Sequence, residues 1–206
     1  MNRRERTTTA MRILQWFGIA AVALVAGVLG IGIAARVADG PLGPFPGGEL
    51  RSGDLVAEQQ VDWSLATGGK VENQGAEPLF VELQLAQPLG SRTTGVLFHE
   101  GELYLPCDLG FVWRRVPAPA RWMLSLIYRL KSWHEHALLD GRVVVRIRGK
   151  RYERRAVRVS DPALLTRLRA EVERGAAQMF GRPLGPAPAE PPNDIWFFRL
   201  EARPST

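Results

Sequence analysis

The sequence predicts a mainly β fold with flanking helices, an antiparallel barrel that is preceded by one transmembrane helix. The first observation is an uncharged apolar run at residues 13–35. The second is the alternation of valine and isoleucine with arginine over residues 142–148, which is the period of a half-buried antiparallel strand. The third is that about six segments of strand character surround two helical patterns, as in a small antiparallel barrel.

The N-terminal region is predicted to be a cytoplasmic tail, residues 1–12, and a signal anchor, residues 13–35. The apolar run is 23 residues long, and at about 1.5 Å per residue it can cross a hydrocarbon core of about 30 Å. Four arginines precede it, so the positive-inside rule predicts a single-pass protein of the cell membrane with its domain outside the cytoplasm. Cleavage as a secretory signal, near Ala34 to Ala38, is the alternative.

Residues 36–48 contain the stretch GPLGPFPGG. This composition is typical of a semi-stiff tether that leads away from the membrane. The globular domain is then predicted to cover residues 49–203, which is enough chain for one ordinary core.

Periodicity places the elements of this domain. Besides the central hairpin, strands are expected at residues 61–66, 79–86, 93–98, 103–106 and 194–202. A helix is expected at residues 120–138, and its wide apolar surface indicates either burial against the barrel or a position in a membrane interface. A second helix is expected to begin at Asp161-Pro162 and to end at Gly175.

The central hairpin, residues 142–158, leaves two interpretations of its register. A turn at Gly149-Lys150 pairs Arg146 with Glu153 on the outer face and places Arg154 on the apolar face. Either a bulge near Arg154 resets the register, which is the favoured interpretation, or this arginine points inward towards an anion.

The same hairpin concentrates positive charge. The chain has a formal net charge of +6, and eight basic residues face one acid between Arg142 and Arg158. Such a cluster suits contact with phosphate or with anionic lipid head groups. The sequence of a nucleic-acid-binding module does not accompany it, so no nucleic-acid partner is expected.

Three motifs of the domain form a recognisable set: Arg92-Thr93-Thr94 before GVLFHEGELYL, Trp133 ahead of Leu139-Asp140-Gly141-Arg142-Val143, and the closing IWFFRLE. On these motifs the sequence resembles the flavin-binding split β-barrel superfamily, which includes pyridoxamine 5′-phosphate oxidase-like proteins and deazaflavin-dependent nitroreductases. The resemblance spans about residues 60–203 and implies a split β-barrel, a homodimer, and flavin mononucleotide (FMN) or a deazaflavin as cofactor. Two departures are Pro106-Cys107-Asp108-Leu109-Gly110 in place of the family's glycine pair, and an insertion at residues 111–130.

The resemblance also implies a cofactor site. Phosphate contacts are expected from Arg92, Thr93, Thr94, Lys131 and Ser132, and ring contacts from Trp133 or Tyr104. An arginine fork and short hydroxyls suit a phosphate group. The catalytic residues stay unassigned, because the flavin itself carries the hydride chemistry.

The histidines and the cysteine do not form the sequence patterns of a metal site or of a disulfide. His134 and His136 lie two residues apart and His99 lies at a hairpin tip, so the histidines do not have a chelating spacing and no metal is expected. The single cysteine, Cys107, excludes an intrachain disulfide.

Two functions from different classes remain. One is a membrane-anchored flavin- or deazaflavin-binding oxidoreductase whose substrate the sequence does not identify. The other is a cofactor-free barrel that serves as a binding or structural module at the membrane surface, with the basic hairpin 142–158 as its contact face.

Overall fold

The computed structural model describes residues 3–43, 46–56, 58–67, 80–86, 90–108, 133–180 and 195–203. Its strands are β1 (Asp54–Val56), β2 (Phe80–Leu85), β3 (Gly90–Gly95), β4 (Leu97–His99), β5 (Glu102–Asp108), β6 (Arg142–Ile147), β7 (Lys150–Arg158) and β8 (Ile195–Ala202). Its helices are α1 (Arg3–Val37), α2 (Trp63–Ala66), α5 (Trp133–Leu139) and α6 (Pro162–Phe180).

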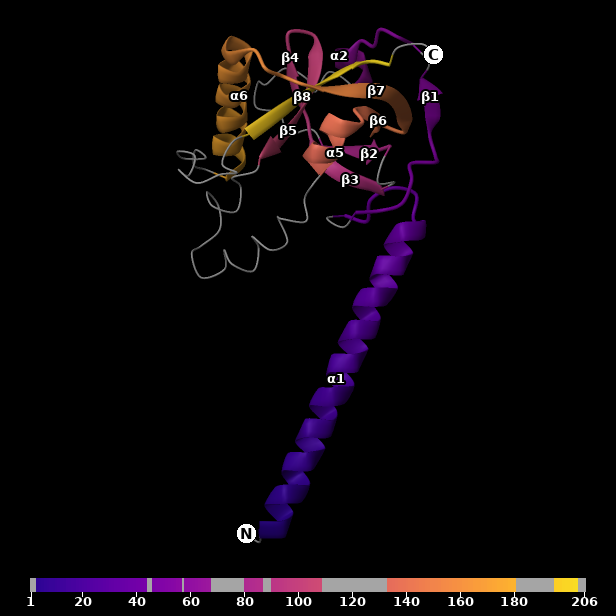
Figure 1. Ribbon diagram of the computed structural model, residues 1–206, viewed down its shortest axis with the longest axis vertical. Helices are drawn as coiled ribbons and strands as arrows, with labels where there is room; N and C mark the ends of the chain where they lie inside the picture. The colour runs from indigo at the N-terminus through magenta and orange to yellow at the C-terminus, as the bar shows by residue number, and fades with distance from the viewer. Residues whose placement is uncertain are drawn as a thin grey trace.

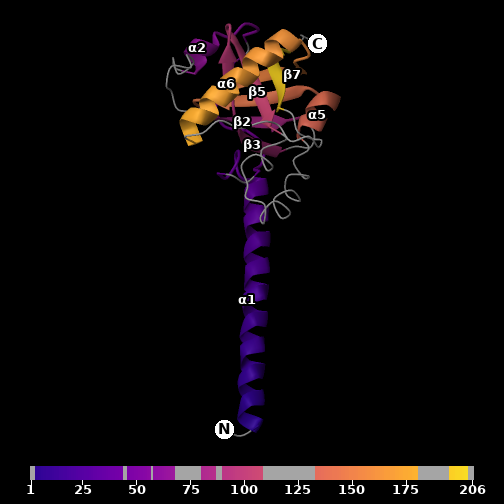
Figure 2. The same cartoon turned by 90° about the vertical axis from the view of Figure 1, so that its left-hand side faces the viewer.

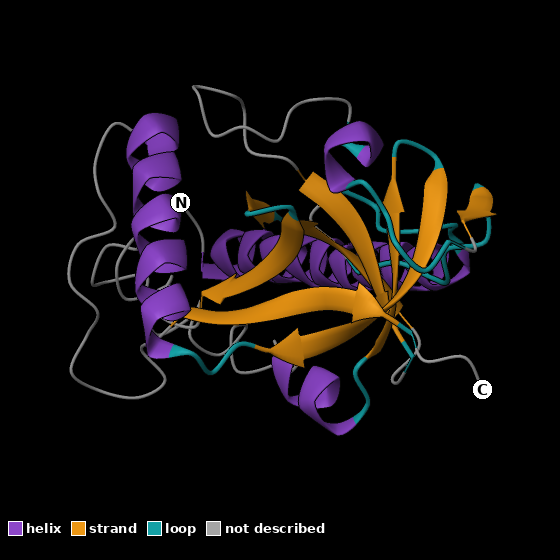
Figure 3. Ribbon diagram, turned by 90° about the horizontal axis from the view of Figure 1, so that it is seen from above, coloured by secondary structure: helices purple, strands orange, loops and turns teal. Residues whose placement is uncertain are grey.

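The eight strands form one curled sheet in the order β3-β2-β6-β7-β8-β5-β4, and β1 adds to β7 off this path (Figure 3). Neighbours along the path pair in antiparallel fashion, whereas β1 runs parallel to β7. The helices α5 and α6 flank the sheet (Figure 1). The predicted class, a mainly β antiparallel fold with flanking helices, is confirmed.

Strand alternation divides the buried side chains into two clusters. The inner cluster fills the curl of the sheet and includes Val81, Leu83 and Leu85 of β2 with Val143, Val145 and Ile147 of β6. The outer cluster lies beneath α6, where Leu168 and Ala176 meet Tyr104 and Phe197. The period of two predicted for β2 and β6 therefore identifies their core face correctly.

The helix α1 leaves the domain as a single rod (Figures 1 and 2). Its stretch Gln15–Val37 is long and apolar enough to cross a membrane. The large side chains along it, among them Trp16 and Phe17, are exposed. This agrees with the length and composition expected of a transmembrane helix, and it leaves the orientation a prediction.

The segment predicted to be a tether lies against the barrel at the base of α1. Arg146 of β6 donates from Nη1 to both carboxylate oxygens of Asp39 at 3.0 Å and from Nη2 to the Asp39 carbonyl at 3.0 Å. Its Nε donates to Glu82, the residue opposite it on β2. The backbone of Gly47 pairs with Ser91 of β3, with N···O distances of 2.8 and 3.1 Å. We call residues 38–43 and 46–52, with Glu82 and Arg146, the junction.

Glycine allows this close approach. A Cβ atom on Gly47 would overlap the backbone of Gly40, and one on Gly48 would overlap carbonyl oxygens of Arg36 and Ala38. Gly40 itself has φ +96°, a conformation that side chains rarely adopt. These glycines therefore let chain segments pack closely against one another. Composition alone does not show whether a glycine-rich segment is packed in this way or is a flexible tether.

The predicted register of the central hairpin is wrong by two residues. The turn is Arg148-Gly149, with φ of 50° and 78°, so Ile147 pairs with Lys150 and Val144 with Glu153. Arg146 therefore does not meet Glu153. Glu153 instead accepts from Arg203 at 3.0 Å.

The bulge favoured near Arg154 is also wrong. Pairing between β6 and β7 runs without interruption from Ile147–Lys150 to Arg142–Arg155. Arg154 is only 4% exposed and points inward, so the inward direction of the second interpretation is confirmed, whereas the expected anion stays a prediction. The partners of Arg154 in the structure are two carbonyl oxygens and the face of Trp63.

A short helix replaces the strand predicted at residues 61–66. Asp62 caps α2 by accepting from the backbone N–H groups of Ser64 and Leu65 at 2.9 and 3.2 Å, which is the role of an N-cap carboxylate. Trp63 then packs on Tyr152 with 5.4 Å between ring centroids. The expected cap at Asp161 is confirmed, and it opens α6 by accepting from Ala163 at 3.1 Å.

Candidate functional site

Arg92 stands out among the residues of the predicted cofactor site because it is a charged residue on the apolar inner face of the sheet. It lies on β3 directly opposite Leu83 of β2, and so its side chain shares the inner face of the sheet. Its Nε is buried, and among the described residues it has no hydrogen-bond partner. Burial lowers the pKa of the guanidinium, and Cys107 partly offsets this. The guanidinium charge therefore lies on the inside of the barrel, and its Nε–H donor is unused among the described residues.

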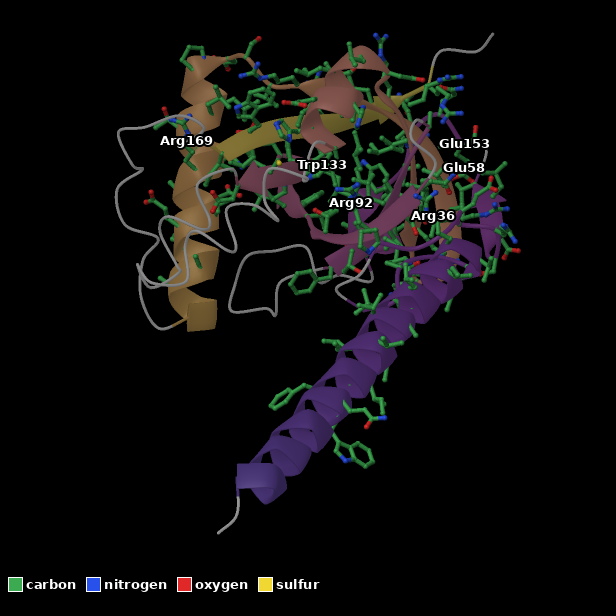
Figure 4. The ribbon with its side chains drawn as sticks, turned by 60° about the horizontal axis from the view of Figure 1, so that its bottom comes forward. Arg36, Glu58, Arg92, Trp133, Glu153 and Arg169 are labelled. Atoms are coloured by element: carbon green, nitrogen blue, oxygen red, sulfur yellow. The ribbon has the colours of Figure 1, made fainter. Side chains whose placement is uncertain are left out.

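Trp133 and Cys107 belong to the same inner cluster as Leu83. Trp133 opens α5, is 1% exposed and packs on Phe198 with 5.4 Å between ring centroids. Figure 4 labels Arg92 and Trp133 on their two elements. Trp133 is thus a core residue here. A cofactor ring could contact it only if the side chains packed around it moved apart.

The two threonines beside Arg92 face opposite ways. Thr94 lies opposite Val81 on the inner face, whereas Thr93 lies opposite Glu82 on the outer face. The Thr93 hydroxyl donates to the carbonyl of Gly43 at 3.3 Å, which is part of the junction. The structure therefore brings Arg92 and Thr94 to one face and places Thr93 on the other.

Tyr104 also lies away from Arg92. On β5 it alternates with Leu103 and Leu105, which face the inner cluster, and it packs beneath α6 in the outer one. It is 3% exposed, and burial raises its pKa. Lys131 and Ser132 directly precede Trp133 in the chain and lie outside the described residues.

Cys107 is the neighbour of Arg92 that the sequence pattern did not single out. It is 1% exposed and continues the inner face of β5 after Leu103 and Leu105. The signal that could have found it is this same period of two along residues 103–107. Cys107 affects the electrostatics of Arg92 because β5 and β3 approach one another across the barrel.

His99 forms a polar pair with Glu171, which the sequence did not predict. Its Nδ1 lies 2.6 Å from a carboxylate oxygen of Glu171, and both side chains are about one-tenth exposed. The pair joins β4 to α6 and lies on the outer side of the sheet with Tyr104. Among the described residues no three His, Cys, Asp or Glu side chains converge as a metal site would require.

Most arginines of the basic hairpin are engaged within the protein. Arg142 pairs with Asp140 at 2.6 Å, and this contact lowers the pKa of that carboxyl to about 2. Arg151 donates to the carbonyls of Gly53 and Leu50 at 3.0 Å, and Arg158 lies 3.8 Å above the ring of Trp196. With Arg146 and Arg154 also engaged, the hairpin offers fewer free cations than its sequence suggests.

Comparison with known proteins adds little. No protein-family model matches the sequence, and a search of curated proteins finds no match. One solved structure with a similar arrangement is a protein of Listeria innocua that is provisionally assigned as a pyridoxamine 5′-phosphate oxidase. It is 13% identical with a TM-score of 0.38, and the match covers 68% of this chain and 94% of that one. At this level the likeness carries no argument about function.

Proposed function

We propose that the domain binds a phosphate-bearing planar cofactor, FMN or a deazaflavin, and acts as an oxidoreductase. The observation that carries this is the Arg92 guanidinium on the inner face of the barrel, whose buried Nε has no hydrogen-bond partner among the described residues. A buried cation without a counter-charge is costly, so an anionic ligand at this position would compensate for it. The resemblance of the sequence to the split-barrel superfamily supports the choice of a flavin.

The residues present fit such a group in part. Arg92 and Thr94 would hold the phosphate from β3, and Lys131 and Ser132, which precede α5, would complete its contacts. Trp133 would lie beside the ring system. Thr93 and Tyr104 face other surfaces, so we leave them out of the proposed site. A bound flavin would supply hydride transfer, while the chain supplies charge and exclusion of water.

The hairpin contacts weigh against the second function, a cofactor-free module at the membrane surface. That function needs the basic hairpin as a free contact face, and five of its eight cations are engaged with carboxylates, carbonyls or an aromatic ring. Arg142 and Arg158 are exposed although they are engaged, and Arg148, Lys150 and Arg155 are exposed and take part in none of these contacts. Three cations contribute about 3 kcal/mol of attraction to an anionic surface, which is weak on its own.

Titration of the purified full-length protein tests the cofactor proposal. Wild-type protein in a non-ionic detergent is expected to bind FMN or the deazaflavin cofactor in the micromolar range, as measured by the change in cofactor fluorescence. The visible spectrum of protein purified without added cofactor provides a second measurement. A dissociation constant above about a millimolar for both cofactors would contradict the proposal and favour the module.

We further propose that α1 anchors the domain outside the cytoplasm. The support is its apolar stretch behind four arginines. A reporter enzyme that is active only in the cytoplasm, fused to the C-terminus, is expected to stay silent, and the same reporter fused ahead of α1 is expected to be active. Strong activity of the C-terminal fusion would contradict this topology.

A further inference from the structure

A small cavity opens where two strands meet the same edge of β7. β1 pairs with this edge at residues 150–152, and β8 pairs with it from residue 154 onward. Glu153 stands between the two, at the seam. A cavity of about 190 Å³ lies there, and we call it the seam cavity; it is lined by Leu55, Val56, Gln59, Glu153, Arg154 and Arg203.

Arg154 places a buried positive charge in the wall of the seam cavity. The residue is 4% exposed, and its guanidinium carbon lies 5.5 Å from the ring centroid of Trp63. Nη1 donates to the Glu153 carbonyl at 3.0 Å and Nη2 to the Glu58 carbonyl at 2.9 Å. A guanidinium has five N–H donors, so others remain for a ligand. Within the described part of the chain, Arg154 forms no ion pair with a carboxylate.

Arg203 adds a second cation to the same cavity. Its Nη1 donates to the Glu153 carboxylate at 3.0 Å and its Nη2 to the Val143 carbonyl at 3.4 Å. Its Nε is buried and, as far as the described residues go, has no hydrogen-bond partner. Two arginines and one glutamate give the cavity a net charge of +1, and Leu55 and Val56 give it an apolar wall.

We propose that the seam cavity binds a small monocarboxylate. Arg154 and Arg203 hold its carboxylate through their planar forks, and Leu55 and Val56 contact a short aliphatic part. Charge and size both select this class. A monocarboxylate balances the net charge of +1, whereas a dianion such as phosphate would leave an excess negative charge beside the Glu153 carboxylate. A volume of 190 Å³ lies below the roughly 300–1,000 Å³ of sites for larger organic ligands, so a flavin or a nucleotide does not fit.

This site is independent of the proposed flavin site. Arg154 lies on β7 and Arg92 on β3, with β2 and β6 between them in the sheet. Failure of the protein to bind a flavin would therefore leave the seam cavity in place, and the reverse also holds.

Isothermal titration of the full-length protein with butyrate tests the proposal. One site with a millimolar or lower dissociation constant is expected at constant ionic strength, and butyramide is expected to bind at least about 10-fold more weakly. Inorganic phosphate is titrated into the Arg92→Met protein, because the proposed flavin site could also bind it, and it is expected there to bind at least about 10-fold more weakly than butyrate. Arg203→Gln should weaken butyrate binding by about 10- to 150-fold. Arg155→Gln removes an exposed arginine of the same strand and should leave it unchanged.

Two further variants separate the site from general stability. Arg154→Lys keeps the buried charge but removes the fork, so butyrate binding should fall at least 10-fold while the circular dichroism spectrum stays native. Arg92→Met should leave butyrate binding unchanged. Equal binding of butyramide, tighter binding of phosphate than of butyrate to the Arg92→Met protein, or a folded Arg203→Gln protein with wild-type affinity would each overturn the proposal.

Discussion

Replacing Arg92 with methionine is expected to weaken binding of FMN or the deazaflavin cofactor by about 10- to 150-fold, which is the loss of one charge-assisted hydrogen bond worth roughly 1.5–3 kcal/mol. Methionine keeps an unbranched apolar stem, so the packing beside Leu83 is largely retained. What disappears is the charge and its donors. The dissociation constant from cofactor fluorescence is the measurement.

The stability of the same variant decides whether Arg92 is functional or structural. A structural arginine would lose partners on replacement, and unfolding would become easier. Arg92 has a buried Nε without a partner among the described residues, so the cofactor-free Arg92→Met protein should be as stable as wild type or more stable, by up to about 2 kcal/mol. A marked loss of stability would show that Arg92 holds the fold.

Arg155→Met is the matched control for this experiment. Arg155 lies exposed on β7 and projects away from the inner cluster. Its replacement should leave both affinity and stability within about 0.5 kcal/mol of wild type. Weakening of cofactor binding by Arg155→Met to the same degree would indicate a general effect of net charge, and Arg92 would lose its assigned role.

The part of this fold that could be predicted is the part that alternation encodes. In β2 and β6 every second residue is apolar, and those residues form the inner cluster. Apolar and polar residues also alternate over residues 61–66, around Trp63, but this segment does not form a strand. Asp62 caps a helix there instead, and the helix is α2. A cap uses one side chain and two backbone N–H groups, and a search for strand periods does not detect it.

The register predicted for the central hairpin is wrong for a specific reason. The prediction of a turn at Gly149-Lys150 relies on one glycine that tolerates positive φ, but the turn needs positive φ at two residues. Arg148 supplies one of them despite its side chain, a choice that sequence preference disfavours. The shift is an even number of residues, so it leaves each face intact and changes only the partners. That is why Arg154 was correctly placed on the apolar face and Arg146 was paired with the wrong acid.

The candidate site shows the same limit. The run Arg92-Thr93-Thr94 marks the start of a cofactor-binding strand by resemblance, yet a strand sends neighbours to opposite faces. Only Arg92 and Thr94 share the inner face. The seam cavity could not be predicted, because it depends on where β1 and β8 end along β7, and element ends are the features that a sequence encodes least precisely.

Arg146→Ala is expected to destabilise the folded domain by about 2–4 kcal/mol. Arg146 joins Glu82, the carboxylate and carbonyl of Asp39, and the Ser52 hydroxyl at 2.8 Å, and its side chain is 12% exposed. Removal of the arginine leaves two carboxylates close together without their shared cation, which costs more than loss of a surface pair. Thermal or urea unfolding of full-length protein in detergent measures the effect. Arg142→Ala, which breaks the exposed pair with Asp140, should cost no more than about 1 kcal/mol.

The pH dependence of stability distinguishes the junction from a general loss of packing. The pKa of Asp39 is held well below its usual range by hydrogen bonds from the Ser52 side chain and the Arg51 backbone, with a further contribution from Arg146. A carboxyl whose pKa is depressed in the folded state stabilises it above the unfolded pKa of about 4, and this stabilisation is lost as the pH falls below that value. Wild-type protein should therefore lose stability between pH 5 and pH 3, as measured by urea unfolding, and Asp39→Asn should lose less over the same interval. An equal loss in both proteins would mean that Asp39 does not hold the barrel to the base of α1, and the glycine contacts of residues 40–48 would then have to hold the junction alone.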